Sequence, residues 1–293
     1  MVLLAPGQGA QTPGMLLPWL GRPGALERVA EWSSAAGVDL LWLGSEADAD
    51  TIRDTAVAQP LLAAAALLSF EVLNVHPDVV LGHSVGELAA LAVADVIDPT
   101  TAVRLAAERG RAMAAAAALT PTGMVAVLGG VEADVLAAAE LLGLEVATVN
   151  VAGQVVLGGR IEDLDAFAAA APAGARVRRL ETAGAFHTRA MASAVPALAG
   201  LIASLPARDP RCAVIANADG AVVRSGRELL DRLVGQLTGP VRFDRCLQTL
   251  AELAPTHVVE LAPGGTLTAM AKRALPGVEL TALRTSDDLP VSA

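Results

Sequence analysis

A serine flanked by glycines supplies the first reactive group of the chain. The pentapeptide Gly82-His83-Ser84-Val85-Gly86 has the pattern Gly-x-Ser-x-Gly and lies between a short apolar run and a helical stretch. In that context the pattern predicts a tight turn from strand to helix that presents the Ser84 hydroxyl as a nucleophile. The N–H of Val85 would then point at an oxyanion formed there. The competing interpretation is an ordinary glycine-flanked turn, which the neighbouring strand and helix disfavour.

A serine nucleophile needs a base, and the chain has four histidines. His76 and His257 each precede a predicted strand, so both are expected at the far edge of the sheet from Ser84. His83 adjoins the nucleophile, and side-chain alternation should point it away. His187 remains as the candidate base, with a purely structural histidine as the alternative. Because no acidic partner is obvious, a backbone carbonyl is expected to orient its ring.

Arg109 is the candidate group for binding an anion. It lies on the helix predicted after Thr100. Its neighbours at helical spacing are apolar or small: Ala102, Leu105, Ala112, Met113 and Ala116. An arginine on such a stripe needs an anionic partner, because burying an unpaired charge is costly. Two interpretations stay open at this point, an internal salt bridge or a substrate carboxylate held by the guanidinium fork.

A glycine-containing loop follows the first apolar run of the chain. Residues 7–11 read GQGAQ, and Thr12 stands where a dinucleotide-binding fingerprint would require its third glycine. The loop is therefore not assigned to nucleotide binding. At the carboxyl end of a strand it could supply a second backbone N–H, that of Gln8, to an oxyanion.

Strands and helices alternate in the regions that must position these groups. Apolar runs at residues 2–5 and 79–81 alternate with helical stretches at 56–75, 87–96 and 100–118. This alternation is typical of a doubly wound parallel sheet. Later in the chain we predict helices at 189–205, 227–236, 243–253 and 266–274 and strands at 213–216 and 258–261.

The middle of the chain follows a different pattern. Between residues 121 and 183 the predicted order is strand, helix, strand, strand, helix, strand, which is the ferredoxin-like unit. We therefore predict an α/β fold in which a hydrolase-like parallel-sheet core domain carries an inserted ferredoxin-like βαββαβ subdomain. The core domain would comprise residues 1–120 and 184–293, and the subdomain residues 121–183.

Composition narrows the classes of function. The 293 residues are 54% hydrophobic and 18% charged, so the chain can bury a large core. A net charge of −10 argues against nucleic-acid and membrane-surface binding. Cys212 and Cys246 form neither a disulfide framework nor a metal-ligand spacing, so we expect no metal. No secretory signal or unbroken membrane span is evident, and a cytoplasmic protein is expected.

Together these motifs resemble the malonyl-coenzyme A:acyl carrier protein transacylases, the acyltransferases of fatty-acid and polyketide synthesis. The resemblance covers nearly the whole chain, and several motifs in the right order are more specific than any one of them. The matching segments are 6–11 (PGQGAQ), 59–60 (QP), 82–87 (GHSVGE), 109–110 (RG), Asn150 with 153–156 (GQVV), 184–187 (GAFH), 239–241 (GPV) and 260–264 (ELAPG).

The resemblance implies a ping-pong acyl transfer. Ser84 would take the malonyl group from malonyl-CoA as an ester and pass it to the phosphopantetheine thiol of acyl carrier protein. His187 would carry the proton, and the N–H groups of Gln8 and Val85 would form the oxyanion hole. Arg109 would pair with the free carboxylate of the malonyl group.

Four further expectations come from the same resemblance. Gln59 and Asn150 would lie in the substrate site. Phe186, directly before the histidine, would favour malonyl over methylmalonyl. The backbone carbonyl of Arg242 would orient His187. The protein would need no cofactor and would act as a monomer on a coenzyme A thioester and acyl carrier protein.

Some features depart from the family pattern or leave alternatives open. Gly239 stands where the family often has Asn, and Gly184 where some relatives carry His. Because the chain is acidic overall, it must dock an acidic carrier protein through a local basic patch. The candidate residues are Arg160, Arg176, Arg178, Arg179 and Arg189. The alternative is that these arginines are scattered and solvated. The competing functions are a serine esterase or thioesterase with water as acceptor, and a catalytically silent subunit that binds the carrier protein. Arg109 argues against the esterase, which has no need of a buried cation.

Overall fold

The centre of the larger lobe is a sheet of short apolar strands. Its two middle strands, β1 (Val2–Ala5) and β2 (Val79–Gly82), run parallel, and all their residues are buried. A strand covered on both faces has no polar side, which is why these stretches are unbroken apolar runs. The other strands of this sheet are β7 (Ala213–Ile215), β8 (Val222–Val223), β10 (His257–Glu260) and β11 (Glu279–Ala282).

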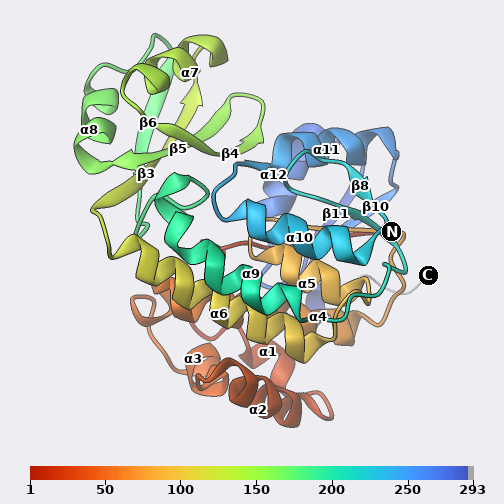
Figure 1. The fold of residues 1–293 in the computed structure, drawn as a ribbon. Helices are drawn as coiled ribbons and strands as arrows, with labels where there is room; N and C mark the ends of the chain where they lie inside the picture. The colour runs from red at the N-terminus through yellow and green to blue at the C-terminus, as the bar shows by residue number, and fades with distance from the viewer. Residues whose placement is uncertain (290–293) are drawn as a thin grey trace.

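The topology of this sheet brings the two glycine loops together. The computed structural model describes residues 1–289 (Figure 1). The strand order is β11-β10-β1-β2-β7-β8, parallel except for β8, which runs antiparallel to β7. Because β1 and β2 are adjacent and parallel, the loops that follow them share one edge of the sheet. The N–H of His83 accordingly donates to the carbonyl of Ala5, at 3.0 Å.

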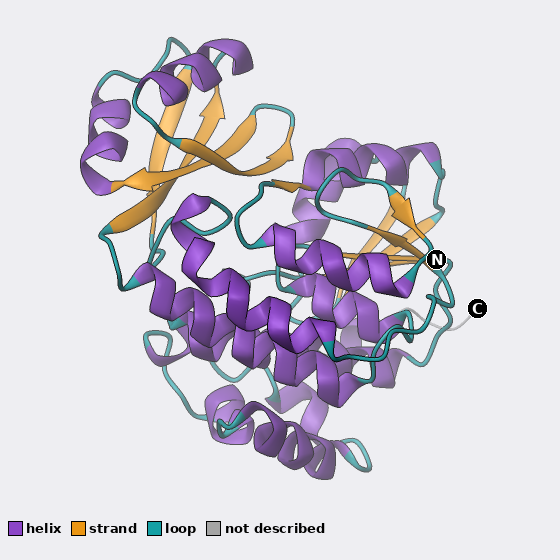
Figure 2. Ribbon diagram, in the orientation of Figure 1, coloured by secondary structure: helices purple, strands orange, loops and turns teal. Residues whose placement is uncertain are grey.

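Helices cover both faces of the large sheet (Figure 2). On one face, Leu3 and Val80 pack into a cluster with α4 (Thr55–Leu73), α5 (Gly86–Val93) and α6 (Pro99–Ala117). On the other, Leu4 and Leu81 pack against α11 (Phe243–Glu252) and α12 (Thr266–Ala274). The remaining helices of this lobe are α1 (Leu17–Leu20), α2 (Ala25–Ala36), α3 (Leu40–Ser45), η1 (Thr51–Arg53), η2 (Arg189–Ala194), α9 (Val195–Ala203), α10 (Gly226–Gln236) and η3 (Ser286–Asp288).

Helix α4 is the one helix within residues 1–289 with the length and hydropathy to cross a membrane, and 72% of that apolar window is buried inside the protein. It packs along α6, where a side chain in place of Gly110 would put its Cβ 2.6 Å from the carbonyl oxygen of Thr55. Its apolar character is therefore that of a core helix, and the close approach of α4 and α6 depends on the glycine beside Arg109.

The smaller lobe has the predicted βαββαβ order (Figure 1). Its elements are β3 (Thr122–Gly129), α7 (Glu132–Leu141), β4 (Glu145–Val151), β5 (Gln154–Arg160), α8 (Ile161–Ala169) and β6 (Ala175–Leu180). The strands form an antiparallel sheet in the order β6-β3-β5-β4, which is ferredoxin-like. The predicted fold class is confirmed, whereas the domain limits at residues 121 and 183 stay a prediction.

One strand of the large lobe extends the small sheet. The two-residue strand β9 (Val241–Arg242) pairs in parallel with β4, with Val241 opposite Thr148 and Arg242 opposite Val149. The sequence did not predict this strand, since two residues carry no periodicity. The pairing joins the two lobes on the side where α10 ends.

Candidate active site

Ser84 occupies a sharp turn between β2 and α5. Its backbone is left-handed, with φ of 54°, a conformation that costs a non-glycine residue free energy. A Cβ at Gly86 would lie 2.2 Å from the carbonyl oxygen of Ala5, so only glycine allows the turn to sit against β1. The strand-turn-helix geometry expected of the pentapeptide is present. It places the Ser84 hydroxyl at the carboxyl edge of the sheet.

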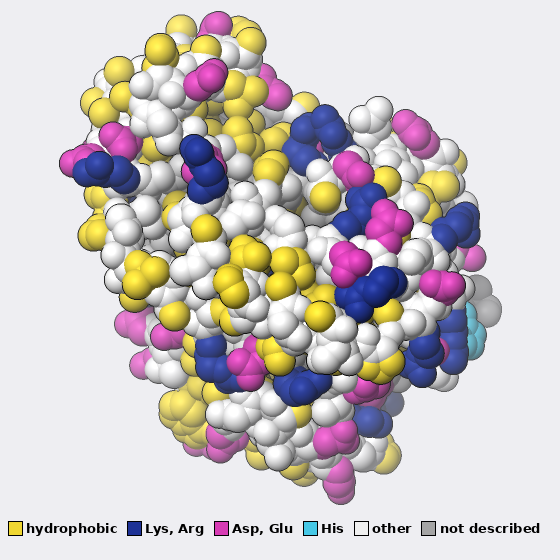
Figure 3. Space-filling model, viewed as in Figure 1, with side chains coloured by type: hydrophobic (Ala, Val, Ile, Leu, Met, Phe, Trp, Pro, Cys, Tyr) yellow, Lys and Arg dark blue, Asp and Glu magenta, His cyan; other side chains and the backbone are white. Residues whose placement is uncertain are grey.

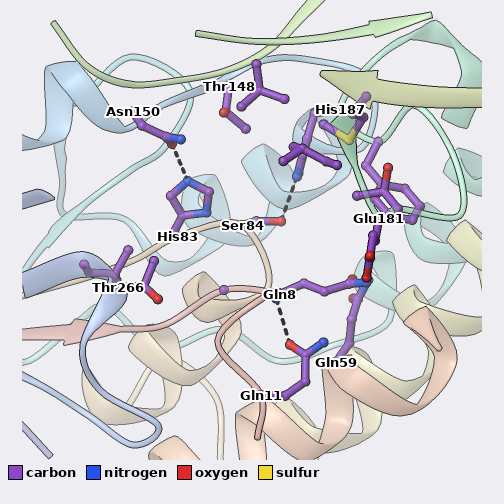
Figure 4. Close-up of a pocket in the computed structure, with 18 of the residues that line it drawn as sticks. Gln8, Gln11, Gln59, His83, Ser84, Thr148, Asn150, Glu181, His187 and Thr266 are labelled. Atoms are coloured by element: carbon purple, nitrogen blue, oxygen red, sulfur yellow. Dashed lines mark hydrogen bonds between the residues drawn. The ribbon is translucent and has the colours of Figure 1, made fainter. Parts of the chain in front are cut away.

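Ser84 and His187 form a hydrogen-bonded pair (Figure 4). Ser84 Oγ lies 2.7 Å from His187 Nε2, and both side chains are buried. The other ring nitrogen, Nδ1, lies 2.8 Å from the backbone carbonyl of Gln236. A carbonyl can only accept, so this bond places the proton on Nδ1 and leaves the Nε2 lone pair facing the serine. The ring is therefore oriented as a proton acceptor.

The orienting carbonyl is that of Gln236, so the expectation for Arg242 is wrong. Gln236 is the last residue of α10, and carbonyls in the last turn of a helix have no partner within the helix. That of Gln236 is therefore free to accept from His187. Arg242 lies beyond the following turn, at the end of β9 and directly before α11, where its N–H donates to the carbonyl of Asn217 at 2.7 Å.

Burial keeps His187 neutral. The pKa of the imidazole falls to about 3. Burial is the largest cause of this lowering, and the nearby positive charge of Arg109 is the second. The ring is consequently uncharged at neutral pH and can accept a proton. An anion bound at Arg109 would offset that positive charge and raise the pKa, which would strengthen the base only when such a ligand is present.

Arg109 is a buried cation next to the nucleophile. Its side chain is 1% exposed, and its Nη2 lies 3.1 Å from Ser84 Oγ. Its other partners are neutral: Nη1 donates to Gln59 Oε1 and Nη2 to Gln236 Oε1, each at 2.7 Å. Burial lowers its pKa to about 10, which still leaves it charged at neutral pH. No direct ion pair satisfies this charge within residues 1–289, and its Nε has no partner there.

Two backbone amides remain available near the serine. In the described part of the chain, neither the N–H of Gln8 nor that of Val85 donates to another residue. Val85 precedes the first turn of α5, where the helix dipole favours negative charge. The side chain of Gln8 is held by a 3.0 Å hydrogen bond to Thr55 Oγ1 and lines the cavity. Both amides are thus suited to a developing oxyanion.

A single cavity between the lobes collects the remaining candidates. Gln59, Asn150 and Phe186 line it together with Ser84 and His187. Figure 4 shows that its walls come from elements far apart in the sequence. Thr148 and Thr182, which the sequence reasoning missed, also line this cavity. Their hydroxyl oxygens are buried, and neither has a hydrogen-bond partner among residues 1–289.

His83 lines the same cavity, so the expectation that it points away is wrong. Strand alternation does not continue through the left-handed turn at Ser84, and the ring turns toward β4. Its Nε2 lies 2.9 Å from Asn150 Oδ1. His257, by contrast, lies at the start of β10 and contacts Thr281, as expected for a residue at the far edge of the sheet.

Three further polar residues beneath the serine were missed. Gln236, Asn217 and Glu87 are all buried there. The sequence does contain a signal for Gln236. It lies on the same apolar face of α10 as Leu229 and Leu233, where a buried polar side chain must find hydrogen-bond partners. Glu87 belongs to the quoted segment 82–87, but an acidic residue in the first turn of a helix is common. Asn217 lies in a loop, and no pattern in the sequence indicates its role.

The comparisons with known proteins agree along the whole chain. The profile of the family described as acyl transferase domain matches residues 2–285. A malonyl CoA-acyl carrier protein transacylase from Mycobacterium tuberculosis is 50% identical over 99% of this chain and 98% of its own length. One from Escherichia coli is 34% identical over 95% of this chain and 94% of its own.

Solved structures give the same result. The crystal structure of MCAT from Mycobacterium tuberculosis superposes with a TM-score of 0.96 at 50% identity, covering 98% of this chain and 97% of that one. A malonyl-transacylase in complex with its type II polyketide synthase acyl carrier protein has a TM-score of 0.90 at 28% identity, with the same coverage.

Proposed function

The chain belongs to the malonyl-CoA:acyl carrier protein transacylases of the acyl transferase family, and we propose that it transfers malonyl groups through an ester on Ser84. Malonyl-CoA is the donor, and the phosphopantetheine thiol of acyl carrier protein is the acceptor. The observation that carries the proposal is the buried guanidinium of Arg109, 3.1 Å from Ser84 Oγ. A cation held beside the nucleophile by neutral partners suits an acyl group with a free carboxylate.

In the first half-reaction Ser84 Oγ attacks the thioester carbonyl. His187 Nε2, at 2.7 Å, takes the serine proton as the new C–O bond forms. The carbonyl oxygen becomes an oxyanion and accepts from the N–H groups of Gln8 and Val85. The C–S bond then breaks, and His187 returns the proton to the coenzyme A thiolate. The malonyl group remains as an ester on Ser84.

The second half-reaction runs the same steps in reverse. The carrier-protein thiol gives its proton to His187, and its sulfur attacks the ester carbonyl. The C–O bond breaks, and the proton passes to Ser84 Oγ. Arg109 holds the carboxylate in both halves, while Phe186 narrows the cavity against a branched acyl group. Thr148 and Thr182 line the cavity through which the pantetheine arm, shared by donor and acceptor, would pass.

Brief mixing with malonyl-CoA tests this function. We expect intact-mass measurement to show an increase of roughly 86 Da, one malonyl group, located on Ser84 and absent from Ser84→Ala. Adding carrier protein should discharge the adduct onto the carrier much faster than free malonate appears. Dominant release of malonate would instead indicate a thioesterase, and no adduct at all would indicate a silent carrier-binding subunit.

We also propose where the carrier protein docks. On the face in Figure 3, basic and acidic side chains are interspersed rather than gathered into one basic patch. Of the five candidate arginines, Arg160, Arg179 and Arg189 pair with neighbouring carboxylates. Arg176 and Arg178, on the exposed edge strand β6, have no carboxylate partner within residues 1–289.

Strand alternation gives these two arginines the same face of β6 as one residue of the cavity. Arg176 and Arg178 lie on the same face of β6 as Leu180, which lines the cavity. A carrier protein seated on this face could send its arm along the sheet toward Ser84. Two unpaired guanidinium groups suit an acidic partner.

Charge reversal at both positions tests the docking proposal. Arg176→Glu with Arg178→Glu should raise the KM for acyl carrier protein by about tenfold and weaken its salt dependence, with acylation at saturating malonyl-CoA unchanged. The matched control is Arg28→Glu. Arg28 lies on α2, away from the cavity, and pairs with Glu71. An unchanged KM, or an equal rise in the control, would contradict the proposed surface.

The proposed setting is fatty-acid synthesis in the cytoplasm, with the protein acting as a monomer. The polyketide transacylase is 28% identical to this chain, against 50% for the mycobacterial enzyme, which favours the fatty-acid pathway. The two free cysteines support a reducing compartment.

A further inference from the structure

A buried carboxylate lies beneath the nucleophile and takes no part in the proton transfers. Glu87 follows the turn in the first helical residues of α5, and its side chain is buried. Its Oε1 accepts from the backbone N–H of Asn217 at 2.6 Å, and its Oε2 accepts from Gln236 Nε2 at 2.5 Å. It is not in direct contact with Arg109. Its effect on the reaction would therefore come through the groups that it orients, such as the Gln236 side chain.

The hydrogen bonds of Glu87 decide which way the Gln236 amide faces. A carboxylate only accepts, so Gln236 must turn its NH₂ toward Glu87. Its Oε1 is thereby directed to Arg109 Nη2, at 2.7 Å. Two weaker contacts of Gln236 Nε2, at 3.3 Å to the carbonyl of Ser84 and to Asn217 Oδ1, favour the same orientation. With the amide reversed, an NH₂ would face the guanidinium, and two donors would oppose each other.

We propose that Glu87 is a positioning residue for malonyl selectivity, which fixes the Gln236 amide so that its oxygen aims Arg109 at the acyl carboxylate. This inference rests on the transacylase function proposed above. The order of contacts is Asn217 N–H, Glu87, Gln236, Arg109. The first group, the backbone N–H of Asn217, can only donate, and the carboxylate of Glu87 can only accept. The direction of each later hydrogen bond, from Gln236 to Glu87 and from Arg109 to Gln236, is therefore fixed.

The alternative role for Glu87 is only to stabilise the amino-terminal end of α5. An acidic side chain serves that purpose best at the surface, near the free helical N–H groups. Glu87 instead turns inward and accepts from two groups of other segments, 130 and 149 residues away along the chain. Burying a carboxylate costs free energy that a helix end alone does not repay. The contacts therefore favour the positioning role.

The charge on Glu87 is sensitive to pH near neutrality. Burial raises the pKa of Glu87 to about 7, against the lowering effects of the Asn217 N–H, Arg109 on α6 and Arg232 on α10. The other ionisable groups that face it are Asp219, in the loop after β7, and the thiol of Cys246 on α11. Below this pKa the carboxyl gains an O–H, which opposes one of the two donors now facing it. Arg109 positioning should therefore weaken as the pH falls.

The substitution Glu87→Gln keeps the shape of the side chain but replaces one acceptor oxygen with a donor NH₂. The new amide must offer its oxygen to the fixed N–H of Asn217, so its NH₂ faces Gln236. Either Gln236 reverses and presents NH₂ to Arg109, or two NH₂ groups remain in contact. We expect kcat/KM for malonyl transfer to fall roughly 10- to 100-fold, the effect of losing a hydrogen bond to a charged group. Acetyl transfer, which does not use Arg109, should fall far less.

The experiment measures acylation of Ser84 from malonyl-CoA and from acetyl-CoA between pH 5.5 and 9. For the unsubstituted protein, the malonyl-to-acetyl ratio should decline below an apparent pKa near 7. For Glu87→Gln it should be low and independent of pH. The matched control is Asp219→Asn, which removes a negative charge from the same neighbourhood and makes no hydrogen bond to Gln236. At pH 9 its malonyl-to-acetyl ratio should equal that of the unsubstituted protein, and the decline should move to lower pH, because Asp219 raises the pKa of Glu87.

Three results would overturn the inference. These are a Glu87→Gln variant with the native ratio, an equal change in ratio for Asp219→Asn, and a ratio in the unsubstituted protein that is flat with pH. The last needs no variant, so the inference stays testable if Glu87→Gln does not fold. Each leaves the Ser84 adduct intact, whereas failure of the transacylase function would abolish it.

Discussion

Replacing His187 with alanine will slow acylation of Ser84 by malonyl-CoA roughly 100- to 10 000-fold, the usual contribution of a positioned general base. Without the imidazole at 2.7 Å, no group within residues 1–289 that contacts Ser84 Oγ can take its proton, since the other neighbour is the cationic Arg109. The rate should be followed by rapid-quench measurement of the adduct. A circular-dichroism spectrum like that of the unsubstituted protein should accompany the loss.

The matched control for this variant is His257→Ala. His257 lies at the start of β10 and hydrogen-bonds Thr281, so its loss should leave acylation unchanged. If His187→Ala acylates at the native rate, the base is another group. His83 would then be tested next, because it lines the same cavity.

Replacing Arg109 with alanine will reverse the acyl preference. Malonyl transfer should lose roughly 100- to 1000-fold in kcat/KM, because the substrate carboxylate would be buried without its partner. Acetyl transfer should be preserved or rise. No unpaired cation remains opposite the methyl group, and the pKa of His187 is no longer lowered by the Arg109 charge. The measurement is the rate of adduct formation from the two thioesters.

Arg111→Ala is the control for Arg109→Ala. Arg111 lies on the same helix but is half-exposed and pairs with Glu108 at 2.8 Å. Both acyl transfers should be unchanged in that variant. An equal loss of malonyl and acetyl transfer in Arg109→Ala would mean that the guanidinium supports the fold of the site and does not bind the substrate.

Local patterns predicted the reactive turn and the general architecture. The glycines around Ser84 encode the turn within five residues, and the apolar neighbours of Arg109 are spaced along one helix. Both signals are short-range, so a single sequence displays them. The same holds for the helix limits: the predicted ends of 227–236 and 266–274 differ from α10 and α12 by at most one residue.

Contacts between distant segments could not be read in the same way. The role of Gln236 lies in its backbone carbonyl, which every residue has, and in helix α10 ending 49 residues beyond His187. Asn217 binds the N–H of Ser84 from 133 residues away. The helices at residues 17–45 were not predicted at all. The His83 expectation was wrong because it extended strand alternation across a residue with positive φ.

The short ladder between β9 and β4 determines what kind of acceptor can use the site. It links the wall that carries Thr148 to the segment just after Gln236, so the two sides of the cavity cannot separate without breaking it. Ser84, 8% exposed, lines the cavity between these two sides. The acceptor sulfur must therefore enter the cavity to reach a side chain that is almost fully buried. Reach alone therefore selects a sulfhydryl carried on a long, slender arm.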